Sequence, residues 1–119
     1  MPSQSGIARD ERSPKDRRSM TIRIGGYTFR GPHRNSRPLL HSSGVYVILG
    51  GDGTAEWTVL DVGESADVRK RVDNHERTQN WRACNHLMTA FAILYVPAPD
   101  RMYIEQELRA QYNPPCRSR

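Results

Sequence analysis

The sequence predicts an α+β domain built on a small, mainly antiparallel sheet. Two pairs of β-branched and aromatic runs flank the glycine-rich turns Gly25-Gly26 and Gly50–Gly53, as in antiparallel hairpins. Two stretches with apolar residues four positions apart, at Val68 and Val72 and again at Ile104 and Leu108, predict helices that bury one face. With 119 residues, of which 36% are apolar, the chain is expected to build one modest core.

The expected order of elements is hairpin, strand, strand, helix, strand, helix. The glycine pair connects the short runs of the first hairpin, and the second hairpin is longer. Ser65 is expected to cap the first helix, and Asn113-Pro114-Pro115 to stop the last one. The expected ranges are 21–24 and 27–30 for the first hairpin, 44–49 and 56–63 for the second, 66–77 for the first helix, 87–96 for the third buried strand and 100–112 for the last helix. A short helix over 81–86 is left open.

The excess positive charge of the chain lies in its N-terminal part. Up to Ser42 the sequence has nine basic and three acidic side chains, a net of +6, whereas the remainder has nine basic and ten acidic ones, a net of −1. Such a segment attracts phosphate through counterion release, so we expect nucleic acid as a partner, with Arg17 and Arg18 among the contacts. A solvated tail or an expression leader is an equally open interpretation of the same charges.

Charge and composition divide the chain into three segments. Residues 1–19 are polar, lack apolar periodicity and are expected to form a disordered basic tail. Residues 20–42 hold the first hairpin and a loop that contains two prolines, and residues 43–119 hold the main domain.

The longest apolar run, Ala90–Val96, is too short to cross a bilayer, and the N-terminus lacks the apolar core of a secretory signal, so a cytoplasmic location without membrane contact is expected. Cys84 and Cys116 are expected to be reduced structural thiols.

Five elements in the main domain share a spacing that resembles the GIY-YIG nuclease superfamily. Two tripeptides come first, an arginine lies ten residues after the start of the second tripeptide, a histidine follows one helical turn later, and a glutamate precedes an asparagine by eight residues. The matching residues are Gly44-Val45-Tyr46, Asp61-Val62-Gly63, Arg71, His75, and Glu105 with Asn113. Each falls on the strand or helix that the family requires, which makes a chance match unconvincing as an explanation.

The resemblance implies a fold, an activity and a set of roles. The fold would be an α/β sandwich in which a three-stranded central sheet is flanked by helices, with the N-terminal hairpin as an addition. The activity would be metal-dependent endonuclease cleavage of nucleic acid, with DNA favoured over RNA and with one Mg²⁺ or Mn²⁺ ion held by Glu105. By similarity, Arg71 would stabilise the transition state, Tyr46 would orient or deprotonate the attacking water, and His75 would act as acid or base.

The chemistry of phosphodiester cleavage explains these residue types. Extra negative charge develops on the phosphoryl oxygens, so catalysis depends on positioning and on charge stabilisation. A hard divalent ion prefers oxygen ligands and keeps several waters, so one carboxylate such as Glu105 suffices. Arg71 offers a planar, permanently charged donor set. A phenol such as Tyr46 deprotonates water only if nearby cations lower its pKa, whereas an imidazole titrates near neutrality. Arg69 and Lys70 add nucleic-acid contacts on the same helix.

Departures from the family pattern keep a second function open. Asp61 replaces the second motif tyrosine, and Glu64 follows where many relatives have a lysine. The chain is therefore either an active nuclease or a catalytically silent module of the same fold that binds nucleic acid or a host protein. A homodimer or a larger targeting partner is also compatible with the sequence. Each site residue has a plainer explanation too: Tyr46 as core, Arg71 as part of a solvated helix face, His75 as a partly exposed histidine without a task, and Glu105 with Arg109 as a surface ion pair.

Overall fold

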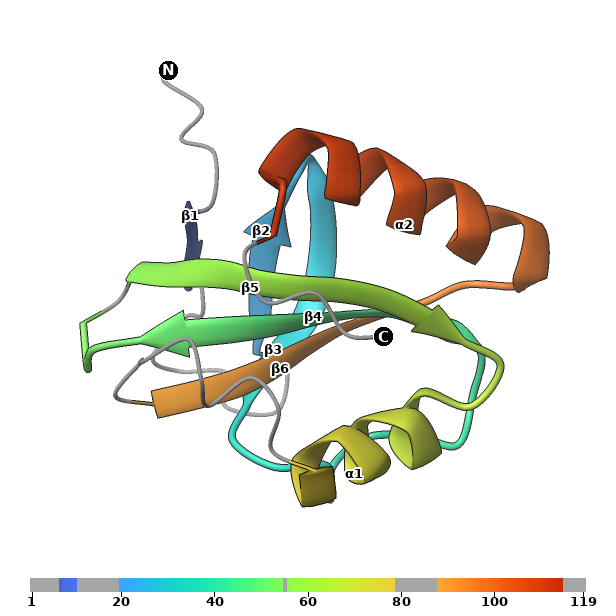
Figure 1. The fold of residues 1–119 in the computed structure, drawn as a ribbon, viewed down its shortest axis with the longest axis horizontal. Helices are drawn as coiled ribbons and strands as arrows, with labels where there is room; N and C mark the ends of the chain where they lie inside the picture. The colour runs from blue at the N-terminus through green and yellow to red at the C-terminus, as the bar shows by residue number, and fades with distance from the viewer. Residues whose placement is uncertain (1–6, 11–19, 55, 79–87, 115–119) are drawn as a thin grey trace.

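The computed structural model describes residues 7–10, 20–54, 56–78 and 88–114 (Figure 1). The elements follow in the order β1 (Ile7–Asp10), β2 (Thr21–Ile24), β3 (Tyr27–His33), β4 (Gly44–Gly51), β5 (Glu56–Ser65), α1 (Val68–Thr78), β6 (Met88–Tyr95) and α2 (Ala98–Tyr112). Both expected hairpins, the third strand and both helices are present, with ends that differ from the expected ones by a few residues. Within these residues, neither helix has the length and apolar character needed to cross a membrane. The short helix left open over 81–86, and both cysteines, lie outside the described residues.

The sheet differs from the predicted one. Its strands are all antiparallel and close on themselves in the order β1-β2-β3-β6-β4-β5, with β1 pairing to β5. The expectation of a three-stranded central sheet with a separate N-terminal hairpin is therefore wrong, although the α+β class is retained. The reason is that β6 does not end the sheet: β3 pairs with its other edge through Arg30 opposite Ile93 and His33 opposite Phe91. The edge of β6 that would otherwise be exposed is therefore paired with β3.

Closure of the sheet depends on a segment that the sequence does not mark as a strand. Residues Ile7–Asp10 belong to the expected disordered tail, yet they form β1. Ile7, Ala8 and Arg9 pair with residues 56–58 of β5, and Arg9 and Asp10 pair with β2. Since β1 is so short, the part of β5 that follows Thr58 has no strand on its outer side among the described residues.

Two apolar clusters lie on opposite faces of the central strands. Along β4, Val45, Val47 and Leu49 belong to the cluster that faces the interior of the closed sheet, whereas Tyr46 and Ile48 belong to the outer one. This alternation is the two-residue period of a strand, and both faces of β4 are buried. The interior cluster includes α2 and the outer cluster includes α1, so the helices lie on opposite sides of the sheet (Figure 1).

Helix α2 covers the opening between the free half of β5 and the β2–β3 hairpin. Its buried residues are Ile104, Leu108 and Tyr112, the first two as predicted. At its C-terminal end the Tyr112 hydroxyl accepts a hydrogen bond from the Gly25 N–H at 2.8 Å. Asn113 ends the helix in the left-handed conformation, with φ 48°, as the sequence predicts for a helix-ending asparagine.

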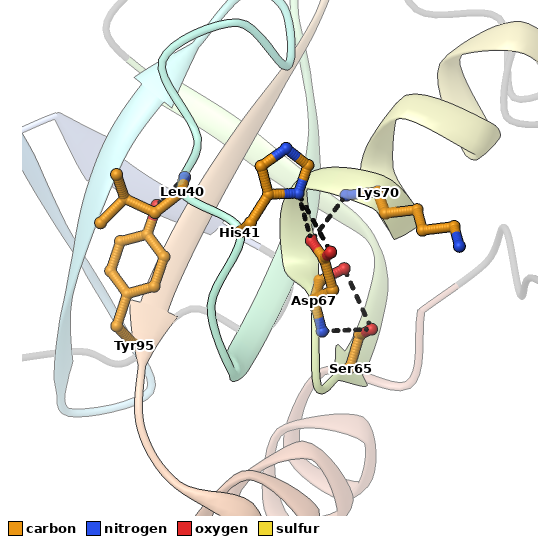
Figure 2. A network of polar contacts seen from close by, with 6 residues as sticks. All are labelled: Leu40, His41, Ser65, Asp67, Lys70 and Tyr95. Carbon is orange, nitrogen blue, oxygen red and sulfur yellow. Dashed lines mark hydrogen bonds and ion pairs between the residues drawn. The ribbon is translucent and has the colours of Figure 1, made fainter.

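The N-terminus of α1 is fixed by a polar network (Figure 2). Asp67, not the expected Ser65, accepts the hydrogen bond of the Lys70 N–H at 3.0 Å and so caps the helix. Ser65 instead holds the capping residue in place, because its hydroxyl accepts the Asp67 N–H at 3.0 Å. His41 contacts both Asp67 carboxylate oxygens at 3.0 Å. The Arg71 N–H donates to the Asp67 carbonyl, so this cap also sets where the Arg71 side chain leaves the helix.

Replacement of Asp67 by alanine is expected to destabilise the protein in a pH-dependent manner. The Lys70 N–H, followed by His41, lowers the pKa of the Asp67 carboxyl below its ordinary value. A lowered folded-state pKa means that the carboxylate stabilises the fold above the unfolded value of about 3.9 and loses this effect as the pH falls through the folded value. Asp67→Ala should therefore lower the melting temperature by a few degrees at neutral pH. The difference should narrow as the pH falls below the unfolded value of about 3.9, when thermal unfolding is followed by circular dichroism. A difference that stays the same above and below this pH would contradict this role for the carboxylate.

Candidate active site

The pairing of β4 with β5 places Tyr46 directly over Gly63. These two motif residues are opposite each other in the ladder. Tyr46 is 1% exposed, and a side-chain carbon added at Gly63 would overlap its phenol ring. Gly44, the first motif glycine, is similarly restricted, because a side chain there would collide with the Leu94 carbonyl of β6. Gly63 is thus needed because the Tyr46 ring packs against its backbone, and Gly44 because the β6 backbone approaches it closely.

The Tyr46 phenol lies next to cationic groups. Burial raises its pKa, and this effect exceeds the opposing hydrogen bond and positive charge of Arg71. Arg109 also lowers the Tyr46 pKa, whereas the Asp61 carboxylate raises it. The net shift is upward, so the phenol is protonated at neutral pH. In this arrangement Tyr46 is a neutral hydrogen-bonding group, and it does not by itself supply the phenolate that deprotonation of water requires.

Asp61 is a buried carboxylate at an irregularity of the ladder. The register of β4 and β5 shifts between Ile48 and Leu49, where Asp61 pairs with Ile48 and Val59 pairs with Leu49. The Asp61 side chain is 2% exposed. Its Oδ1 accepts the Val62 N–H at 2.9 Å and an Nη2 hydrogen of Arg109 at 3.2 Å. A buried charge requires such a partner, because desolvation without compensation is costly.

Arg109 joins Asp61 to Glu105. Its Nε donates to Glu105 Oε2 at 2.5 Å, one turn earlier in α2, while its Nη2 reaches Asp61. The Arg109 and Glu105 side chains are 28% and 18% exposed. The sequence suggested this pair only as a surface ion pair, on the basis of the i,i+4 spacing. The buried second partner makes it part of the site instead.

A second ion pair holds the other end of α2 to the same strand. Arg101 Nε donates to Glu64 Oε1 at 2.5 Å, and Arg101 Nη1 donates to the Ser43 hydroxyl at 2.9 Å. The Ser43 hydroxyl in turn donates to the Val96 carbonyl at 2.7 Å. Glu64 therefore pairs within the protein. No pattern in the sequence pointed to Arg101.

The structure connects four of the predicted site residues, directly or through Arg109. Tyr46 contacts Arg71, which is exposed on α1, and Asp61 is connected to Glu105 through Arg109. Asn113 fixes the end of the helix that carries Glu105. His75 lies one turn after Arg71 in α1, but its side chain is outside the described residues. Arg69 is half-buried and Lys70 is exposed on the same helix, whereas Arg17 and Arg18 lie outside the described residues.

The donor set is compatible with one hard divalent ion. The described residues contain no group of three or more His, Cys, Asp or Glu side chains of the kind that makes a protein-only metal cage. Mg²⁺ does not require such a cage, because it keeps several waters and needs one or two carboxylates. Asp61 and Glu105 offer two carboxylates that converge on a single cationic group, the Arg109 guanidinium. The residues present therefore fit an ion of this class.

Comparisons with known proteins add no relative. No protein-family model, no curated protein and no solved structure matches the chain. The GIY-YIG resemblance accordingly depends on the motif residues and their arrangement, and it stays a prediction.

Substitution of Gly63 by alanine tests the packing that positions Tyr46. Because the new carbon would overlap the phenol ring, the ring or the strand must shift, and we expect the unfolding free energy to fall by about 1–3 kcal/mol. Urea denaturation of the wild type, Gly63→Ala, Tyr46→Leu and the double variant measures the coupling. The alanine should cost clearly less in the Tyr46→Leu background, and the same cost in both backgrounds would be incompatible with this packing.

Proposed function

We propose that this chain is a metal-dependent endonuclease of the GIY-YIG type that hydrolyses phosphodiester bonds in nucleic acid, with DNA favoured over RNA. The supporting observation is the connected set of Tyr46, Arg71, Asp61 and Glu105 beside the free half of β5. Tyr46 is next to Arg71 and is influenced by the charges of Asp61 and Arg109, and Arg109 contacts both Asp61 and Glu105. An exposed arginine, a neutral phenol and two carboxylates suit the binding of a phosphodiester, a water and a cation.

In the proposed reaction, a water oxygen forms a bond to phosphorus while the bond from phosphorus to the leaving oxygen breaks. The products are a phosphate monoester and a free hydroxyl, which takes up one proton. Arg71 donates hydrogen bonds to the phosphoryl oxygens, where negative charge increases in the transition state. The protonated Tyr46 phenol holds the attacking water by a hydrogen bond. His75, one turn after Arg71, accepts the proton of this water, because an imidazole titrates near neutrality.

A bound Mg²⁺ or Mn²⁺ ion supplies positive charge to the phosphoryl group and lowers the pKa of a bound water. Glu105 and Asp61 would hold this ion, with Glu105 on α2 and Asp61 on β5. Asp61 could hold the ion only if its contact with Arg109 were loosened, because the carboxylate is buried and paired. Under this proposal, Asp61 in place of the second motif tyrosine would offer an oxygen ligand where the family has a phenol.

A catalytically silent module is the competing proposal. The observation in its favour is that Arg109 already neutralises both carboxylates. In that case the ion would not be held, and Arg71 with neighbouring cations would bind nucleic acid without cleaving it. The two proposals differ in one outcome, which is metal-dependent cleavage.

Arg71→Ala and Glu105→Ala are each expected to lower the cleavage rate by about 10³-fold or more, because both neutralise the same phosphoryl charge. The measurement is cleavage of circular DNA, linear DNA and RNA with Mg²⁺, Mn²⁺ or chelator. Glu107→Ala is the matched control, since it makes the same change two residues along α2, where the side chain accepts a hydrogen bond from the Tyr27 hydroxyl instead. Near wild-type cleavage by both site variants would show that the site is wrongly assigned. Absence of cleavage by the wild type under all conditions would leave the silent module.

Basic residues of the N-terminal half are expected to set the salt dependence of binding. Deletion of residues 1–19 is a poor test, because it removes β1 from the sheet. Charge-neutralising pairs avoid this: Arg17→Gln with Arg18→Gln in the tail, and Arg23→Gln with Arg30→Gln on the exposed face of β2 and β3. Removal of one arginine that touches phosphate should lower the slope of log affinity against log salt by about 0.9. Fluorescence anisotropy with labelled DNA measures the slope, and an unchanged slope for a pair excludes that pair from binding to phosphate.

A further inference from the structure

Arg109 contacts both carboxylates that the proposed site assigns to a divalent ion. Its guanidinium donates to Glu105 at 2.5 Å and to Asp61 at 3.2 Å. The two partners come from different elements, α2 and β5, and one of them is almost completely buried. A single cationic group therefore lies where the charges of two anionic ligands converge.

Arg101 provides an internal comparison on the same helix. It also pairs with a carboxylate of β5, Glu64, at 2.5 Å, but its second contact is the neutral Ser43 hydroxyl. The Glu64 side chain is 30% exposed, so solvent screens this pair more than it screens Asp61, which is 2% exposed. Arg101 thus acts as a clamp between α2 and β5, and Arg109 is distinguished by its two anionic partners.

We propose that Arg109 is an internal counterion that competes with the divalent ion for Asp61 and Glu105. The proposal rests on the proposed function, which makes these carboxylates the ion ligands. A carboxylate as buried as Asp61 is stabilised by a neighbouring cation, so departure of the guanidinium is favoured when another cation takes its place. Arg109 is able to leave, because its side chain is 28% exposed and carries its charge on a flexible stem. Occupation by the guanidinium and occupation by the ion are then mutually exclusive.

The consequence is a weakened affinity for the ion. Binding of the ion has to displace a charge-assisted contact to each carboxylate, so wild-type protein holds the ion less tightly than a protein without Arg109. Glu105 lies one turn from Arg109 on the same helix, so rotation of the two side chains is enough to separate them. Arg109 is in this sense a residue that sets metal affinity and takes no part in bond breaking.

The test is a titration of the metal-free protein with Mn²⁺, in the absence of nucleic acid, followed by the electron paramagnetic resonance signal of free Mn²⁺. Arg109→Gln should bind Mn²⁺ at least about tenfold more tightly than the wild type, since removal of a competitor of this strength is worth about 1.4 kcal/mol or more. Arg101→Gln, which makes the same charge change, should stay within about twofold of the wild type. Adding Glu105→Gln to Arg109→Gln should abolish the gain. No gain in Arg109→Gln, or an equal gain in Arg101→Gln, would overturn the proposal.

A second pair of variants covers the case in which Arg109→Gln fails to fold because Asp61 loses its contact with the guanidinium. Asp61→Asn removes the buried charge, so Asp61→Asn with Arg109→Gln should fold and bind Mn²⁺ more tightly than Asp61→Asn alone. Equal Mn²⁺ affinity of these two variants would overturn the proposal independently of the single variant.

The titration also separates this proposal from the proposed function. Tighter Mn²⁺ binding by Arg109→Gln in a protein that cleaves no nucleic acid would support the role of Arg109 and overturn the nuclease assignment. Metal-dependent cleavage by the wild type, with Mn²⁺ affinity unchanged in Arg109→Gln, would support the nuclease assignment and overturn the role of Arg109.

Discussion

A carboxylate that water cannot reach needs a cation within the protein, and Asp61 imposes this requirement on the fold. Its side chain is 2% exposed in the middle of β5, and Arg109 of α2 supplies the charge. Removing one partner of such a pair leaves an uncompensated buried charge, at a cost of roughly 3–5 kcal/mol. The last turns of α2 are therefore held against β5, and with them Glu105, which shares the same guanidinium.

The position of α2 matters for closure of the sheet as well as for the site. Strand β1 pairs with residues 56–58 only, so the remainder of β5 lacks a strand neighbour on that side among the described residues. Helix α2 covers this opening, with Arg101 and Arg109 paired to β5 and with Tyr27 and Gly25 of the β2–β3 hairpin bonded to Glu107 and Tyr112. The helix that closes the fold also carries Glu105. Changes that loosen the fold at this edge would consequently disturb the site.

Periodicity and capping signals in the sequence predicted helix faces and helix ends. They did not predict which strands and side chains distant in the sequence come into contact. The buried faces of both helices and the end of α2 at Asn113 follow from periodicity and capping. The sheet closure was missed because Ile7–Asp10 has a mixed, polar sequence, and its pairing with residues about fifty positions away leaves no local signal. Ser65 and Asp67 are both good caps, so only geometry distinguishes them. Arg109 was visible beside Glu105 at i,i+4, whereas its contact to Asp61, 48 residues earlier, was not.

The charges of the site explain why an ion and a substrate would favour each other's binding under the proposed function. In the described arrangement the Arg109 guanidinium contacts the carboxylates of Asp61 and Glu105, the Arg71 guanidinium lies beside the Tyr46 phenol, and this phenol is neutral. A phosphodiester alone would add negative charge next to buried Asp61, and a divalent ion alone would add two positive charges beside both guanidinium groups. When both bind, each reduces the electrostatic cost of the other, and this coupling is reciprocal by thermodynamic necessity. Asp61 and Arg109 act together in this balance, so any role of Asp61 in binding an ion depends on the arginine that neutralises it.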